Sequence, residues 1–115
     1  MESPQGLEKF QPSNREECGI IIKASDRTYV VKVPNHAKGN SDYAITLKDM
    51  QSIQNVLSDD EQIVGFFHTH LAHHDCEPTD ADFDGSEAFP EFTNMIYKPD
   101  TGETSWYGAL KEVDV

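Results

Sequence analysis

The chain has 115 residues, which is enough for one domain that buries about two thirds of the surface its unfolded form exposes. It carries 21 acidic and 9 basic residues, and the net charge of -12 repels phosphate backbones and anionic membrane surfaces. We therefore expect neither nucleic-acid nor membrane binding, and a polypeptide partner suits this charge better. No apolar stretch has the length of a membrane span and the start lacks a signal-peptide pattern, so the expected location is cytoplasmic, in the host if the protein is phage-encoded.

The first third of the chain predicts an arm followed by a hairpin. Residues 1–14 contain Pro4, Gly6 and Pro12 and allow only a short helical turn at 7–10. The apolar run at 18–23 is typical of a strand that is buried on both faces. The β-branched and aromatic residues at 28–33 predict the strand that pairs with it.

A polar loop at 34–42 and a possible short pairing segment at 43–45 lead into the clearest helix. Thr46 is a good N-cap, and Asp49 stands at the position that would complete a capping box. The residues that repeat on one face of this predicted helix are Leu47, Met50, Ile53, Val56 and Leu57.

The second half predicts three more strands and a short helix. The strand at 62–70 carries the histidines, a helix follows at 79–89, and further strands are expected at 93–98 and 103–109, before a tail at 110–115. From these residues alone, the chain is a single α/β or α+β domain over 1–115.

The histidines are concentrated in one short stretch. Four of the five lie between positions 68 and 74. Val64, Phe66, His68 and His70 alternate along the predicted strand and are expected to share one face. Two imidazoles on one strand face can point at one ion, and Asp82 can complete a His-His-Asp site.

Three nitrogen and oxygen ligands with a position left for water are typical of catalytic zinc, so we predict one Zn²⁺ held by His68, His70 and Asp82. The simpler interpretation is that the two histidines are ordinary strand residues. The cysteines form no Cys-x-x-Cys pair and the chain has no secretion signal, so we expect no structural zinc and no disulfide, and we place Cys76 outside the ligand set.

The same stretch resembles the signature of the JAMM (MPN+) metalloproteases. Their His-Ser/Thr-His and Pro-Ser/Thr-x-x-Asp patterns are similar to His68-Thr69-His70 and Pro78-Thr79-x-x-Asp82. Upstream, their Glu-x-Cys-Gly segment is similar to Glu16-Glu17-Cys18-Gly19. The resemblance covers roughly residues 14–109, with Leu71 in place of the usual proline and a loop one residue longer.

The resemblance implies the MPN (cytidine-deaminase-like) fold, a mixed β-sheet flanked by helices, in a minimal prokaryotic or phage-type member. It implies a zinc-dependent peptidase or isopeptidase that acts at the C-terminal tail of a ubiquitin-like, sulfur-carrier or phage tail protein. Glu16 would be the general base, and Thr79 would donate its hydroxyl to the oxyanion or the water. Glu17 is the competing acid, but neighbouring strand residues face opposite ways and the family spacing selects Glu16.

Other interpretations of these residues stay open. An MPN scaffold would keep the fold and bind a partner without turnover. Asp80-x-Asp82-x-Asp84-Gly85 with Glu91 matches the EF-hand calcium-loop pattern, although no helix is predicted to enter it. Thr79-x-x-Asp82 is also a helix capping box. His73, His74 and Asp75 receive no role.

Overall fold

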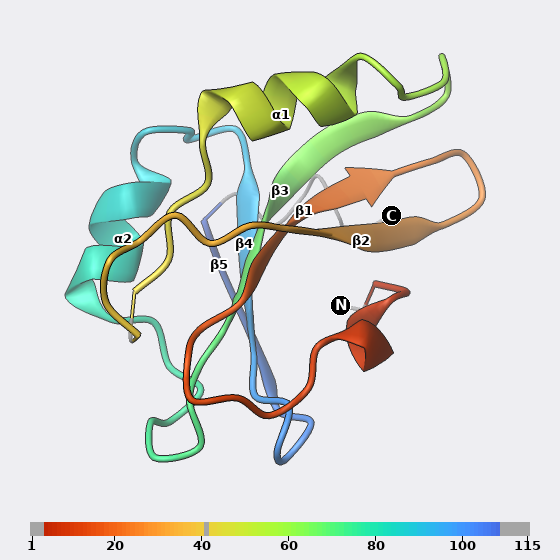
Figure 1. Cartoon of the computed structure of the whole chain (residues 1–115). Coiled ribbons are helices and arrows are strands. Elements are labelled where there is room, and N and C mark those ends of the chain that lie inside the picture. Colours follow the sequence, from red (N-terminus) through yellow and green to blue (C-terminus); the bar gives the residue numbers. More distant parts are fainter. Residues whose placement is uncertain (1–3, 41, 109–115) are drawn as a thin grey trace.

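The computed structural model describes residues 4–40 and 42–108, which form a five-stranded mixed sheet with two helices (Figure 1). The predicted tail at 110–115 lies outside these residues. The strands are β1 Cys18–Lys23, β2 Thr28–Val33, β3 Gln62–Thr69, β4 Thr93–Tyr97 and β5 Thr104–Gly108, and the helices are α1 Leu47–Gln54, α2 Asp80–Ser86 and a 3₁₀ turn at Leu7–Lys9.

The sheet has the order β2-β1-β3-β4-β5, and only β3 and β4 run parallel. Parallel neighbours need a crossover, and the segment that contains α2 supplies it. The expected α/β class is therefore present, with a mixed sheet and two helices. Neither helix in the described ranges is long and apolar enough to cross a membrane.

One face of the sheet packs under both helices. Ile20, Ile22 and Phe66 form its buried centre, and Met50 and Ile53 of α1 lie against it. The helical spacing of these α1 residues explains the contact, because it places them on one stripe of the helix. The helix begins as predicted, since the Thr46 hydroxyl accepts a hydrogen bond from the Asp49 N–H at 3.2 Å.

The opposite face is covered by the N-terminal segment, which packs against the sheet. The backbone of Gln5 bonds to β2, and Phe10 is only 2 % exposed, with its ring 4.4 Å from that of Phe67. Ile21 and Met95 complete this second cluster. Residues 4–10 of the predicted arm thus supply part of the core.

Both helices are shorter than predicted, since α1 ends at Gln54 rather than near Leu57 and α2 ends at Ser86 rather than at 89. The segment 43–45 is not a strand. In that segment, the Ala44 carbonyl accepts a single backbone bond from His36 N at 3.1 Å. The segment instead lines a cavity together with residues of α2.

The predicted common face of β3 is interrupted by a β-bulge. Ile21 pairs with Gly65 and Ile22 with Ile63, so Val64 is the extra residue on β3. The extra residue reverses the alternation, and Val64 joins the cluster around Phe67 instead of lying on the histidine side. The prediction for Val64 was therefore wrong.

Gly65 gives the sheet a position that tolerates no side chain. A Cβ atom there would meet the backbone oxygen of Thr93 well inside van der Waals contact, and backbone atoms cannot move aside cheaply. We predict that Gly65→Ala lowers the free energy of unfolding by roughly 2–3 kcal/mol, as overpacking does. Denaturant unfolding checks this.

The matched control is Gly85→Ala in α2, where a Cβ meets nothing within 4 Å. Alanine is the better helix former, so this variant should be as stable as the parent or more stable. Equal stability of Gly65→Ala and the parent protein would contradict the close approach at β4.

Candidate metal centre

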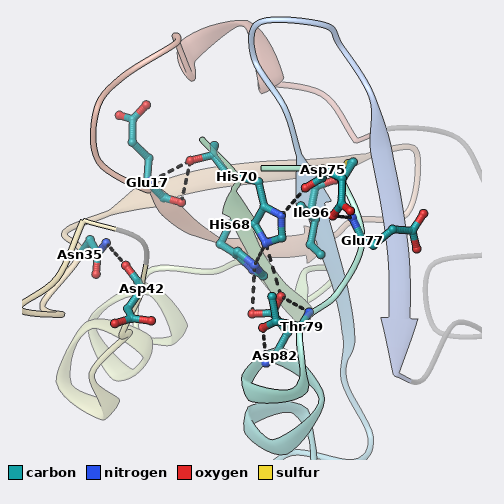
Figure 2. Close-up of polar contacts among 12 residues, drawn as sticks. Glu17, Asn35, Asp42, His68, His70, Asp75, Glu77, Thr79, Asp82 and Ile96 are labelled. Carbon is teal, nitrogen blue, oxygen red and sulfur yellow. Dashed lines mark hydrogen bonds and ion pairs between the residues drawn. The ribbon is translucent and has the colours of Figure 1, made fainter. Parts of the chain in front are cut away.

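Two elements bring three ionisable side chains together at the end of β3. His68 and His70 project from that end, and Asp82 projects from the first turn of α2 (Figure 2). The Nε2 atoms of the two histidines lie 3.3 Å apart. Asp82 Oδ1 is 3.3 Å from His68 Nε2, and Asp82 Oδ2 is 3.4 Å from His70 Nε2.

The second nitrogen of His70 fixes the orientation of its ring. His70 Nδ1 lies 2.7 Å from the carbonyl oxygen of Asp75, so this nitrogen is the N–H donor and Nε2 keeps its lone pair. Burial lowers the pKa of His70, but the Asp82 carboxylate and the Asp75 carbonyl outweigh it and leave the pKa raised. The Nε2 lone pair faces Asp82 and His68.

His68 is held by burial and stacking. It is 1 % exposed, and the Tyr43 ring stacks on it at 4.2 Å with an interplanar angle of 13°. Burial lowers the pKa of His68 in spite of the Asp82 carboxylate. Its Nδ1 atom has no hydrogen-bond partner within residues 4–40 and 42–108. The ring therefore favours the neutral form, which is the form that binds metals.

Asp82 completes the helix cap and faces the histidines at the same time. The Thr79 hydroxyl accepts from Asp82 N at 3.1 Å, and Asp82 Oδ2 accepts from Thr79 N at 3.0 Å. Burial alone would raise the pKa of Asp82, but its contacts with both imidazoles and the cap hold it well below the usual range. Each carboxylate oxygen has two lone pairs, so the cap leaves acceptor capacity for an ion.

These three side chains can hold a metal ion. One ligand atom from each lies within 4.8 Å of the others, and all three residues are largely buried. Two imidazole lone pairs and a carboxylate that converge on one point repel one another unless a proton or a cation lies between them. The donor set therefore fits a divalent cation.

A cavity of about 630 Å³ opens beside this group. Glu16 lines it together with His70 and Asp82. It is 4 % exposed, and burial raises the pKa of its carboxyl to about 8, with Asp82 and Asp42 adding to the rise and His70 opposing it. Its neighbour Glu17 forms an ion pair with Lys32 instead. Of the two candidate acids, Glu16 is the one that lines the cavity.

The start of β1 is fastened to the end of β3. Glu17 N donates to the Thr69 hydroxyl at 2.8 Å, and Thr69 N donates to the Glu17 carbonyl at 2.9 Å. These bonds join residues more than 50 positions apart in the sequence. They place Glu16 beside the histidines that flank Thr69.

Asn35 is a residue that the sequence analysis did not single out. Its Nδ2 donates to the carbonyl oxygens of Glu16 (2.8 Å) and Asp42 (2.9 Å), and its Oδ1 accepts from the N–H groups of Ala37 and Ala44, both at 3.0 Å. Figure 2 shows the bond to Asp42. All four hydrogen-bonding positions of the amide are used, so one side chain joins Glu16 to the segment that carries Tyr43. A single Asn in a polar loop offers no spacing signal from which this could have been predicted.

Thr79 is exposed and lines the cavity. Its hydroxyl oxygen accepts the capping bond from Asp82, which leaves its single O–H free to donate. The predicted capping box is confirmed, and it does not compete with a donor role for Thr79.

The loop between His70 and Thr79 divides into two parts. His73 and His74 line the cavity, whereas Cys76 is buried against Ile96 and Tyr107. The Cys76 carbonyl accepts a bond from Ser105. Cys76 thus anchors the longer loop to β4 and β5 and lies outside the three-residue ligand group.

The calcium-loop pattern does not form a loop here. Its first seven positions, Asp80–Ser86, are helix α2. A regular helix cannot wrap its side chains around one ion as the EF-hand loop does. This conformation favours the histidine-containing group as the metal site.

A comparison with known proteins finds no family model and no curated protein that matches this chain.

The raised pKa of Glu16 predicts a pH-dependent stability of the metal-free protein. The Glu16 carboxyl stays protonated up to about pH 8 in the folded protein but only up to about pH 4.5 in the unfolded chain. The contribution of this proton to the free energy of unfolding is therefore complete below pH 4.5 and is lost as the pH rises to 8. Replacement by Gln removes this dependence. We expect the stability of the parent relative to Glu16→Gln to fall by roughly 3 kcal/mol between pH 5 and 8.

Denaturant unfolding in the presence of a chelator measures the difference. Glu17→Gln changes the neighbouring acid outside the cavity and is the matched control, which should keep the pH dependence of the parent. Parallel stability curves for Glu16→Gln and the parent would contradict the burial of a protonated Glu16.

Asn35→Asp tests the amide that joins Glu16 to the cavity wall. The variant has the same shape but turns a carboxylate oxygen toward two carbonyl oxygens, so we expect a loss of roughly 2–3 kcal/mol and faster exchange of the hydrogen-bonded amides of Ala44 and His36. The control is Tyr29→Phe, which removes the hydroxyl bonded to Glu61 at 2.5 Å. It should lose stability without faster exchange at those two amides. Unchanged exchange in Asn35→Asp would show that Asn35 does not hold the wall.

Proposed function

We propose that this protein is a zinc-dependent peptidase or isopeptidase of the JAMM type, with an MPN fold. The observation that carries the proposal is that Glu16 lines the same cavity as His70 and Asp82, two members of the group that could hold a metal ion. A metal group alone would serve a structural role equally well. A buried acid beside it supplies the proton acceptor that hydrolysis needs.

The spacing of the three ligands supports zinc. At the usual zinc distances of about 2.0–2.2 Å, the corners of a tetrahedron lie about 3.3–3.6 Å apart. The two Nε2 atoms are 3.3 Å apart, as two such corners are, and each Asp82 oxygen lies near one of them, Oδ1 at 3.3 Å from His68 and Oδ2 at 3.4 Å from His70. Two imidazoles and one carboxylate are the donor types of catalytic zinc, and imidazole is a poor ligand for calcium or magnesium.

A bound Zn²⁺ would lower the pKa of a water ligand to about 7 and polarise the carbonyl to be attacked. Glu16 would take a proton from the attacking water and return it to the leaving nitrogen as the carbon–nitrogen bond breaks. Its pKa of about 8 in the metal-free protein would fall beside a cation, into the range of a general base near neutral pH. The free O–H of Thr79 would donate to the developing oxyanion.

The substrate would be the extended C-terminal tail of a ubiquitin-like, sulfur-carrier or phage tail protein. A flexible tail can lie in the cavity as an extended strand and bring one peptide bond to the metal. The net charge of -12 favours a neutral or basic polypeptide. The resemblance of the His-Thr-His and Pro-Thr-x-x-Asp residues to the JAMM signature supports this substrate class.

A non-catalytic MPN scaffold is the alternative function. It would use the same fold to bind a partner and would have no use for a buried Glu16, which is destabilising when it ionises. The two functions differ in one variant. Glu16→Gln should abolish hydrolysis in a peptidase and leave partner binding intact in a scaffold.

Metal content is the first test of the zinc site. We predict about one zinc per chain by mass spectrometry of the purified protein, and its loss in His68→Ala, because two remaining ligands hold zinc weakly. His73→Ala, a histidine of the adjoining loop outside the ligand group, is the matched control and should keep the metal. Absence of zinc in the parent after reconstitution would refute the site.

Turnover is tested with the zinc-loaded protein and a mixed library of unstructured peptides and ubiquitin-like tails. Glu16→Gln should retain zinc and lose at least about 100-fold in kcat, which is within the range for a general base. Retention of activity in this variant would assign the proton transfer to another group. Zinc binding without cleavage of any library member would favour the scaffold.

A further inference from the structure

The cavity extends well beyond the metal ligands along β3. Phe66 and His70 both line it, and Phe66 lies four residues before His70, about 13 Å along an extended chain. The segment 42–45 forms one wall and α2 the other. A water molecule occupies about 30 Å³, so a cavity of about 630 Å³ has room for several substrate residues besides an ion and its water.

The end of the cavity away from His70 is apolar. Phe66 and Phe89 meet there edge to face, with ring centroids 5.3 Å apart, and Ile45 lies in the opposite wall. Gly85 is four residues before Phe89 and faces the cavity with open space where a Cβ would be. Since none of these residues can bind a metal, this end has no part in holding the ion.

The rim of the cavity is acidic. Asp42 and Asp75 are exposed at its edge, and Glu16 and Asp82 lie inside it. Among the lining residues within the described part of the chain, the only groups that could balance these acids are histidines. An acidic substrate residue would be repelled here, whereas an uncharged or basic one would not.

We propose that Ile45, Phe66, Gly85 and Phe89 form a subsite for one aliphatic or aromatic side chain of the substrate, within about four residues of the bond that is cut. This inference rests on the proposed peptidase function. An extended peptide advances about 3.3 Å per residue, so about four residues cover the roughly 13 Å from His70 to Phe66. The side chain leaves water for an apolar surface, and the acidic rim selects neutral or basic residues on either side of it.

The test uses the zinc-loaded protein and a peptide library in which every position on both sides of the cleavage point is varied. We expect enrichment of Leu, Ile, Met or Phe at one position within about four residues of the cut, by about 10- to 100-fold in kcat/KM over Gly and Asp. Gly85→Leu adds a side chain on the subsite side, where its Cβ would meet nothing within 4 Å. This variant should keep its zinc and lose the enrichment at that position.

The matched control is Gln54→Leu, which adds the same side chain at an exposed position of α1 and should keep the enrichment. Cleavage without any preference at that position would overturn the subsite. A preference that survives in Gly85→Leu would also overturn it. In both cases the cleavage itself supports the peptidase function.

A binding measurement tests the subsite without any turnover. N-acetyl-leucinamide should shift the NMR signals of the Phe66 and Phe89 rings in the parent protein, and N-acetylglycinamide should not. The shifts should disappear in Gly85→Leu. If the parent cleaves no peptide but binds N-acetyl-leucinamide in this way, the peptidase function fails and the apolar site stands. If N-acetyl-leucinamide shifts neither ring, the apolar site fails whatever the cleavage result.

Discussion

The position of the Asp82 carboxylate is the constraint on which the rest of the site depends. It accepts the capping bond from Thr79 and faces both imidazoles, so the start of α2 and the end of β3 are fixed to each other by one side chain. A helix start is a good place for this residue because the free N–H groups and the helix dipole both favour a negative charge there. The same bonds that begin the helix therefore orient the ligand.

The buried ionisable groups around Asp82 are costly to the folded protein. Glu16, His68 and His70 are almost fully buried, and none of them has an arginine or lysine partner among the described residues. A core of apolar residues at these positions would be more stable in the absence of a ligand. Such a concentration of ionisable groups in a cavity is typical of a functional site, and a bound cation would remove much of the repulsion.

Local patterns in the sequence predicted the elements but not every contact between them. The alternation of Phe66, His68 and His70 and the Thr79-x-x-Asp82 cap depend on residues close in sequence, and both are present. The bulge at Val64 depends on how β1 pairs with β3, and its only local sign is the glycine that follows. Strand pairing across more than 40 residues is not visible in local spacing.

In the candidate site, too, local sequence patterns predict some residues and not others. The group of His68, His70 and Asp82 could be predicted because two elements adjacent in the chain supply it. Asn35 and Tyr43 could not, because their roles arise from one loop that packs against the ends of β1 and β3. A polar loop has no repeating pattern, so only its tertiary contacts distinguish an anchoring amide from a solvated one.

The short distance along the chain between the three candidate metal ligands has a consequence for how the protein is prepared. His68, His70 and Asp82 lie within one short stretch of sequence, together with His73 and His74. An unfolded chain can chelate a transition metal through such a stretch, and any affinity of the unfolded form reduces the stabilisation that the metal gives. Glu16 arrives only when β1 pairs with β3. A transition metal present during refolding would therefore bind this stretch before Glu16 is in place, and refolding in chelator followed by metal addition lets the cavity form first.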